Sequence, residues 1–428
     1  MPARFSTQAR RRLVLSLGAV LCAAAVALAT SVGPDVTVFN ITDVANYTTS
    51  GPEGGFRGYA LGTDSCNVGD QPVWWCDSST AFCTEEQHPV IAQNLYRLEA
   101  GRFEQIGMSW LKHGFFSLNS PNAACNPARP CGGAPHGGAQ LGIGCTDVYG
   151  GGLNGSTPLG MRSEVNATTG QFPFPYTPVG TSAEPDQRVK VLDADVDIAA
   201  HPTALYWAET QYVAADDAAA NNGLNNASYR SVSVGSAPSR FISVTGSTVR
   251  ERTALHAWKA TDPGVEIYNA DFTSDASTIV ERFEGGLRAT DLGGGLWHYE
   301  AAIRNMNSKR AARGYTMTFP PGTTLSNPGA HVISHHSGEP YTAEDWDVDV
   351  SGSVVTWSTD TFAINANANA LRWGTTFTFR IDADHPPENR PTHMLTLFEP
   401  GTPNQVPIFS ALFSDGFERG LAWAASFP

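Results

Sequence analysis

The most regular stretch of the sequence runs Leu371-Arg372-Trp373-Gly374-Thr375-Thr376-Phe377-Thr378-Phe379-Arg380-Ile381. Its large apolar residues, at positions 371, 373, 377, 379 and 381, share one parity. Successive side chains of a strand point to opposite faces of a sheet, so this parity predicts one strand with one buried face. We expect it to be the longest strand of the chain.

Flanking segments show the same alternation. Apolar residues alternate with polar ones over 297–303 and again over 315–319, on either side of a basic turn at 307–310. We interpret these two segments as a hairpin with one buried face.

Shorter strands are predicted at 354–357 and around Leu395 and Leu397. Strands this close together, separated by Pro and Gly turns, are typical of an immunoglobulin-like sandwich. We therefore predict a C-terminal immunoglobulin-like β-sandwich over residues 276–408, followed by a tail at 409–428.

Strand patterns also precede this domain. Residues 186–275 alternate over 189–198, 205–213 and 229–234, which predicts a middle β segment. Between the last two lies an Ala- and Asn-rich stretch, 216–226, which fits either a short helix or a polar loop.

A first region, residues 30–185, is rich in Cys and Gly. Within 90–118, apolar residues have helical spacing at 91, 95 and 98 and then alternate at 106, 108 and 110. We interpret this pattern as a short helix, a turn at Ala100-Gly101 and a strand. With the cysteines described below, the region predicts a disulfide-stabilised N-terminal domain.

Composition supports the same class and excludes one kind of partner. Of 428 residues, 42 are Gly and 28 are Pro, while only 16% are charged, which is typical of a turn-rich, mainly β protein. The length suits two or three domains. A formal charge of −14 does not provide the basic surface that a nucleic-acid-binding protein needs.

The N-terminus predicts export. Arg4 and the arginines at 10–12 precede an uncharged apolar run, 13–29, which ends in small residues suited to signal peptidase. We expect cleavage near Thr30, so that residues 1–29 are a signal peptide and no transmembrane segment remains. Loss of four arginines takes the formal charge to −18. Either the general or the twin-arginine route is open, and the protein would be secreted, at the cell surface or periplasmic.

Six cysteines remain after cleavage. An even number within a short span of an exported chain predicts disulfides, and the absence of a C-x-x-C pair argues against a zinc site. The sequence does not choose among the possible pairings. The predicted disulfide framework contains Cys66, Cys76, Cys83, Cys125, Cys131 and Cys145.

Several histidines suggest a transition-metal site. Two or three imidazoles with a carboxylate suit copper, zinc or iron. If histidines from the first and last domains met in space, the site would lie between these domains, where pockets are common. The alternative is that the histidines belong to a polar loop and a turn. The metal hypothesis concerns His88, His113, His335, His336 and Glu339.

Two sets of alternating aspartates form a second constellation. On strands, each set would present a row of carboxylates, which Ca²⁺ could neutralise. Neither set has the Gly and Glu positions of an EF-hand. The alternative is a solvated strand face on an acidic chain. The calcium hypothesis concerns Asp193, Asp195, Asp197, Asp345, Asp347 and Asp349.

Signatures of common hydrolases are missing from the sequence, including H-E-x-x-H, G-x-S-x-G and a Walker loop. Paired acids for glycoside hydrolysis stay open, because the two partners can be distant in sequence. Trp74-Trp75 is the clearest candidate for stacking on sugar rings. Adjacent strand residues face opposite ways, so we expect one of the two to belong to the core.

Three segments carry a resemblance to other proteins: Gln105-Ile106-Gly107-Met108-Ser109-Trp110-Leu111-Lys112-His113, His336-Ser337-Gly338-Glu339-Pro340-Tyr341 and Asn369-Ala370-Leu371-Arg372-Trp373-Gly374. They are similar to segments of a family of uncharacterised, exported, β-rich bacterial proteins, over most of the mature chain. That family has no known activity, so the resemblance implies export and supplies no catalytic residues. The stretch 413–418 with Trp423 resembles short tails of secreted Gram-negative proteins, which implies export or surface sorting.

Two functions are compatible with these observations. The first is an exported binding protein, extracellular or at the cell surface, whose partner is a polysaccharide or a cell-surface component. The second is a secreted metal-dependent enzyme, for example an oxidative copper enzyme, acting on a polymer. Exposed aromatic or acidic patches would favour binding, whereas convergence of at least three of the predicted ligands would favour the enzyme.

Overall fold

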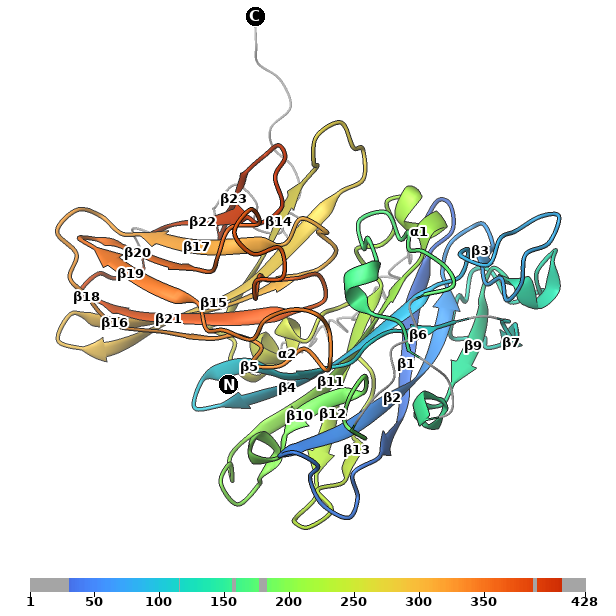
Figure 1. The fold of residues 1–428 in the computed structure, drawn as a ribbon, viewed down its shortest axis with the longest axis horizontal. Helices are drawn as coiled ribbons and strands as arrows, with labels where there is room; N and C mark the ends of the chain where they lie inside the picture. Colours follow the sequence, from blue (N-terminus) through green and yellow to red (C-terminus); the bar gives the residue numbers. More distant parts are fainter. Residues whose placement is uncertain (1–30, 115, 156–158, 177–182, 388–390, 410–428) are drawn as a thin grey trace, which may run out of the picture.

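The computed structural model describes residues 31–114, 116–155, 159–176, 183–387 and 391–409. Strand accounts for 43% of the chain and helix for 7%, which confirms the mainly β prediction. The strands form two lobes, one built on a large sheet and one on a pair of smaller sheets (Figure 1). In the part of the chain that the structure describes, no helix has the length and apolar character needed to cross a bilayer. The predicted signal peptide and most of the predicted tail lie outside the described residues.

The first lobe contains an 11-stranded sheet whose main path is β13-β12-β11-β4-β5-β10-β2-β9-β7, with β1 paired to β2 and β6 paired to β4. A separate two-stranded sheet joins β3 to β8. The strands are β1 (Val36–Asn46), β2 (Phe56–Asn67), β3 (Val73–Trp74), β4 (Val90–Glu99), β5 (Arg102–Met108), β6 (Lys112–His113), β7 (Ser120–Pro121), β8 (Gln140–Leu141), β9 (Cys145–Tyr149), β10 (Val189–Leu192), β11 (Leu205–Val213), β12 (Ala227–Val234) and β13 (Ile242–Val244).

The strands predicted as a middle segment belong to this same sheet. β10 lies between β5 and β2, and β11 pairs along its whole length with β4. Val189 and Val191 of β10 are buried in one core with Tyr59 and Ile106. The boundary predicted near residue 185 therefore does not separate two sheets, because the apolar face of the earlier strands is completed by the later ones.

The helix predicted within 90–118 is wrong. This segment is β4, and all of its residues up to Leu98 are buried. Ile91 and Leu95 face the core of the first lobe, whereas Tyr96 and Leu98 pack in a second cluster with Trp258. A strand covered on both faces does not alternate, so its apolar spacing imitated that of a helix. The predicted turn is confirmed, with both of its residues at positive φ, as a tight hairpin requires.

Two short helices complete the first part of the chain. α1 (Ala215–Ala219) is followed by a polar loop, so both alternatives considered for 216–226 occur in succession. α2 (Leu255–Thr261) packs against β14 and β15 of the second lobe. Its Trp258 is fully buried, which fixes the helix to the sandwich.

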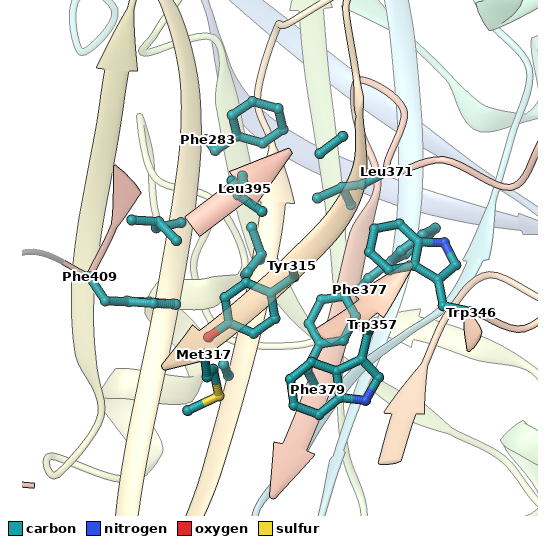
Figure 2. Packing of buried hydrophobic residues seen from close by; sticks show 14 of the residues in the cluster. Phe283, Tyr315, Met317, Trp346, Trp357, Leu371, Phe377, Phe379, Leu395 and Phe409 are labelled. Carbon is teal, nitrogen blue, oxygen red and sulfur yellow. The ribbon is translucent and has the colours of Figure 1, made fainter. Parts of the chain in front are cut away.

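The second lobe is a sandwich of two five-stranded sheets, ordered β14-β15-β16-β21-β18 and β19-β20-β17-β22-β23. One core lies between them, and Figure 2 shows Tyr315 among Trp357, Phe379 and Leu395. The ring centroids of Tyr315 and Phe379, which come from opposite sheets, are 4.9 Å apart. The strands are β14 (Glu266–Phe272), β15 (Glu281–Gly293), β16 (Leu296–Asn305), β17 (Ala312–Thr318), β18 (Leu325–His331), β19 (Asp347–Ser351), β20 (Val354–Ser358), β21 (Thr376–Ala383), β22 (Thr392–Leu397) and β23 (Gln405–Ile408).

The predicted hairpin between 297 and 319 is wrong, although both strands exist. β16 and β17 belong to different sheets, and the basic turn carries the chain from one sheet to the other. β16 pairs instead with β15 and β21, and β17 pairs with β20 and β22. Alternation shows which face of a strand is buried but does not identify its neighbour.

The stretch 371–381 is not one long strand. β21 begins at Thr376, because Gly374 has φ +73° and turns the chain before it. Leu371 lies in the sandwich core, whereas Trp373 packs with Val90 and Leu111 of the first lobe. Residues that share one parity in the sequence therefore belong to two different cores. The longest strand is β15, with 13 residues.

The two lobes meet through polar side chains. Nη1 of Arg304, on β16, lies 2.6 Å from Oε1 of Glu209, on β11, and neither side chain is exposed to solvent. Arg304 also donates to the hydroxyl of Tyr96 at 2.9 Å and to Gln211 at 2.6 Å. Nearby, the backbone N–H of Thr376 donates to Gln105 at 2.7 Å. Each lobe thus satisfies buried polar groups of the other.

Candidate functional site: an aromatic patch on disulfide-tethered loops

Three disulfides confirm the predicted framework and supply the pairing that the sequence left open. They join Cys66 to Cys125, Cys76 to Cys83 and Cys131 to Cys145. Their sequence separations are 59, 7 and 14 residues. Cys66 lies at the end of β2 and Cys145 begins β9, and Cys76 follows β3. The bridges therefore tether the loops next to these strands, and β3, β7 and β9 lie at one end of the first lobe (Figure 1).

Three aromatic rings stack on these loops. The centroids of Phe82 and His136 are 4.1 Å apart with an interplanar angle of 13°. Trp74 lies nearly parallel to both, with its centroid 5.7 Å from that of His136 and 6.3 Å from that of Phe82. Phe82 is 44% exposed, so the stack is open to solvent.

The covalent framework explains how short loops hold this stack. Trp74 pairs with Gln140 across the β3–β8 ladder. The Cys76–Cys83 bridge closes the loop that carries Phe82, and the Cys131–Cys145 bridge closes the loop that carries His136. Asp216 of α1 also accepts a hydrogen bond of 2.9 Å from the backbone N–H of Trp74. The rings are therefore held in place before any ligand arrives.

Two further exposed residues extend the same surface. Phe116 and Leu118 are 59% and 61% exposed. The backbone N–H of Phe116 donates to the carbonyl of Trp75 at 3.0 Å, and that of Ser117 donates to the carbonyl of Gly138 at 2.7 Å. These contacts place Phe116 beside the stack, and Leu118 follows two residues later in the chain. We use the name aromatic patch for Trp74, Phe82, Phe116, Leu118 and His136.

Sequence reasoning identified only one member of this patch. Trp75 is fully buried and Trp74 is partly exposed, which confirms that one of the pair is core. Phe82 and His136 were missed, because no periodic pattern marks a loop residue. The available signal was the position of each ring inside a segment bounded by cysteines.

The histidines of the metal hypothesis fall into separate places. His88 Nε2 lies 2.7 Å from His113 Nδ1, beside the ring of Phe172. His335 packs edge-on against Phe56. His336 Nε2 lies 2.9 Å from the side-chain oxygen of Asn369.

Glu339 has protein partners of its own. It accepts hydrogen bonds from the backbone N–H of Arg162 at 2.5 Å and from the hydroxyl of Ser163 at 2.7 Å. Within the described residues, no group of three or more His, Cys, Asp or Glu side chains is arranged to hold a metal ion. The histidines thus meet as one pair, and the convergence that would favour a metal-dependent enzyme is not found there.

The first aspartate set does not form a row, which corrects the strand expected there. Residues 193–196 form a 3₁₀ helix, and each aspartate pairs with an arginine. Asp193 lies 2.5 Å from Arg57, and Asp197 lies 2.9 Å from Arg240. Asp195 lies 3.1 Å from an arginine of β4. These ion pairs balance the charge of the carboxylates.

The second aspartate set is only partly on a strand. Asp347 and Asp349 lie on β19, at the edge of one sandwich sheet, and both are exposed. Asp345 precedes the strand. Charges on an edge strand disfavour pairing with another chain, which is a sufficient reason for this pattern.

Replacement of His335 by leucine should reduce the acid sensitivity of the fold. Burial lowers the pKa of His335 to about 3. Below about pH 6.5 this imidazole binds a proton in the unfolded chain but not in the folded chain. Acidification below that pH therefore favours the unfolded chain and lowers the free energy of unfolding. Between pH 6.5 and 4.5 the variant should lose about 2 kcal/mol less free energy of unfolding than the parent.

Urea unfolding at several pH values checks this prediction. Ile364→Ala, at a side chain that is 74% exposed and carries no titratable group, is the control and should keep the parent's slope. Burial raises the pKa of Asp64 and of Asp216 to about 6, so protonation of these carboxyls favours the folded chain on acidification. Both groups are present in parent and variant, so their effect on the free energy of unfolding cancels in the comparison. An identical slope in parent and His335→Leu would contradict the prediction.

Comparison with known proteins adds little. No protein-family model and no curated protein matches the chain. Among solved structures, the N-terminal domain of the Streptococcus gordonii adhesin Sgo0707 aligns over 88% of this chain and 96% of its own, at 9% identity and a TM-score of 0.18. At that TM-score the likeness carries no argument, and the function has to be inferred from the site.

Proposed function

We propose that this chain is an exported binding protein that holds a neutral polysaccharide against its aromatic patch. The single observation that carries the proposal is the solvent-open stack of Trp74, Phe82 and His136 on loops closed by disulfides. Monomeric proteins rarely leave large apolar side chains gathered on one surface unless the surface has a partner.

Sugar rings suit this surface for a physical reason. Aromatic side chains offer a large, rigid apolar face at little cost in conformational entropy, and an aromatic face packs well on the C–H face of a sugar ring. Loops fixed by covalent bridges also lose little freedom when a ligand binds. The acidic balance of the chain disfavours polyanionic polymers, which supports a neutral glycan or cell-surface component.

Export is part of the proposal. Three disulfides support an oxidising compartment, since such bonds are rare in reducing cytosol. The arginine-led apolar run at 1–29 supports a signal peptide, and the resemblance to exported bacterial proteins points the same way. We infer that the mature protein acts outside the cytoplasm, in the medium or at the cell surface.

Replacement of Trp74 or Phe82 by alanine should weaken polysaccharide binding at least about fivefold, because each change removes a stacking face worth about 1 kcal/mol or more. Affinity electrophoresis in gels that contain a neutral glucan, mannan, xylan or galactan measures this directly. Ile364→Ala is the matched control, since Ile364 is 74% exposed but belongs to the other lobe. We expect this control to migrate like the parent.

Two results would contradict the proposal. One is equal retardation of the parent and both patch variants. The other is the absence of retardation by every neutral polysaccharide in the panel. Thermal unfolding of each variant, monitored by circular dichroism, separates loss of binding from loss of fold.

A further inference from the structure

A cleft lies between the two lobes and shares no lining residue with the aromatic patch. It is a cleft of about 390 Å³, bordered by the loop before α2, by α2 itself and by the outer face of β14 and β15. The side chains that matter here are polar: Glu251, Arg252, Thr253, His256, Asn269 and Glu284.

Strand register explains why polar residues line the cleft. Asn269 of β14 lies directly opposite Glu284 of β15, which in turn lies opposite Arg304 of β16. This row faces away from the sandwich core, because the neighbouring Tyr268 and Phe283 point into it. At Arg304 the first lobe covers the row through Glu209. Toward β14 the same row borders the cleft.

The best-ordered part of the cleft is a carboxylate–imidazole pair. Glu284 Oε1 lies 3.1 Å from His256 Nε2, and the hydroxyl of Thr253 donates to the other oxygen of Glu284. Burial alone would raise the pKa of Glu284, but these hydrogen bonds, above all that from His256, hold it below its ordinary value. Glu284 thus fixes the imidazole ring, whose Nδ1 has no hydrogen bond within the described residues.

Other polar atoms of the cleft lack protein partners. The side-chain oxygen of Asn269 is buried and has no hydrogen bond in the described part of the chain. Arg252 is exposed, and its one hydrogen bond within the described residues is to the carbonyl of Glu251, at 3.3 Å. Glu251 has φ +56°, a conformation that costs energy outside glycine and that is concentrated at functional sites. Buried polar groups are normally hydrogen-bonded, so the side-chain oxygen of Asn269 calls for a ligand or water.

We propose that this cleft binds a single neutral sugar residue, at a site separate from the aromatic patch. Sugar hydroxyls both donate and accept, which matches the amide of Asn269, Nδ1 of His256, the guanidinium of Arg252 and the carboxylate of Glu251. Arg282 also lines the cleft, but its guanidinium is paired with Asp271. The carboxylates of Glu251 and Glu284 face Arg252 and His256, so the cleft does not select an anion. Its volume lies at the small end of the range for ligand sites.

The test uses the whole mature protein and named monosaccharides. Isothermal titration calorimetry with glucose, galactose, mannose and N-acetylglucosamine should show saturable binding of at least one. Asn269→Leu and Arg252→Ala should each weaken that binding at least tenfold. Lys259→Ala is the control, because Lys259 is exposed on α2 and does not line the cleft. Unchanged binding in Lys259→Ala is expected.

Variants at each of the two sites distinguish binding in the cleft from binding at the aromatic patch. Monosaccharide binding should survive Trp74→Ala, which disables the aromatic patch alone. Loss of monosaccharide binding in Trp74→Ala but not in Asn269→Leu would overturn the proposal, as would no heat of binding from any neutral sugar at tens of millimolar. Tighter binding of glucuronate than of glucose, abolished in Arg252→Ala, would overturn the neutral class. Equal melting temperatures of Asn269→Leu and the parent show that the fold is kept.

Discussion

Replacement of Arg304 by methionine should lower the free energy of unfolding by about 3–5 kcal/mol, the largest effect we expect from a single substitution. Arg304 and Glu209 are wholly buried at the junction of the lobes, 2.6 Å apart. Without the guanidinium, the carboxylate of Glu209 would remain buried without its ion-pair partner. The hydroxyl of Tyr96 and the amide of Gln211 would each lose a hydrogen bond as well.

A second variant identifies the cause. Combining Arg304→Met with Glu209→Gln removes the stranded charge while keeping an oxygen acceptor for the N–H of Ala254, which now donates to Glu209 at 2.8 Å. The double variant should therefore be more stable than Arg304→Met alone. Urea unfolding followed by tryptophan fluorescence gives both values. Arg313→Met, at a half-buried arginine on β17, should shift stability by no more than about 0.5 kcal/mol. A double variant that is less stable than the single one would contradict this explanation.

Removal of the Cys66–Cys125 bridge by double alanine replacement should cost about 4 kcal/mol of unfolding free energy. The bridge closes a sequence separation of 59 residues, so its loss frees a long loop in the unfolded chain. The same change at Cys76–Cys83, which closes only 7 residues, should cost about 2 kcal/mol.

Guanidinium unfolding under non-oxidising, thiol-free conditions measures both double variants against the parent. The order of the two losses is the decisive result. A larger loss for the short loop than for the long one would show that packing around the bridges, rather than the entropy of the unfolded chain, sets their contribution. Removal of the Cys76–Cys83 bridge should weaken binding at the aromatic patch more than removal of the Cys66–Cys125 bridge does, because Phe82 lies in the loop that Cys76–Cys83 closes.

Local patterns in the sequence predicted the class of the fold and failed on its connectivity. The parity of Phe377, Phe379 and Ile381 marks one buried face correctly. It gives no information on where the chain turns, and the turn at Gly374 delays the start of the strand to Thr376. Pairing was misjudged for the same reason, since β16 and β17 share a core without sharing a sheet.

Candidate sites were predicted less well, because their members are brought together only by tertiary structure. His88 and His113 meet, but His335 and His336 are drawn into other packing environments, against Phe56 and Asn369. The six cysteines were recognised from number and compartment, whereas their pairing depends on three-dimensional contacts. Alternation in the sequence could have predicted the polar row on the outer face of β14 and β15. That this row borders a cleft depends on the position of α2, which the sequence pattern does not give.

The place of β10 in the large sheet has a consequence for how the chain can be divided. β10 is hydrogen-bonded to β2 on one side and to β5 on the other, although it follows both in the sequence. A nascent or truncated polypeptide that stops before Val189 would hold two vacant strand edges in the middle of its sheet, and such edges recruit other chains. We therefore expect a fragment that carries only the crosslinked loops and the aromatic patch to associate with other chains. A shortened version has to extend through β10 to fill this gap and through β13 to complete the sheet.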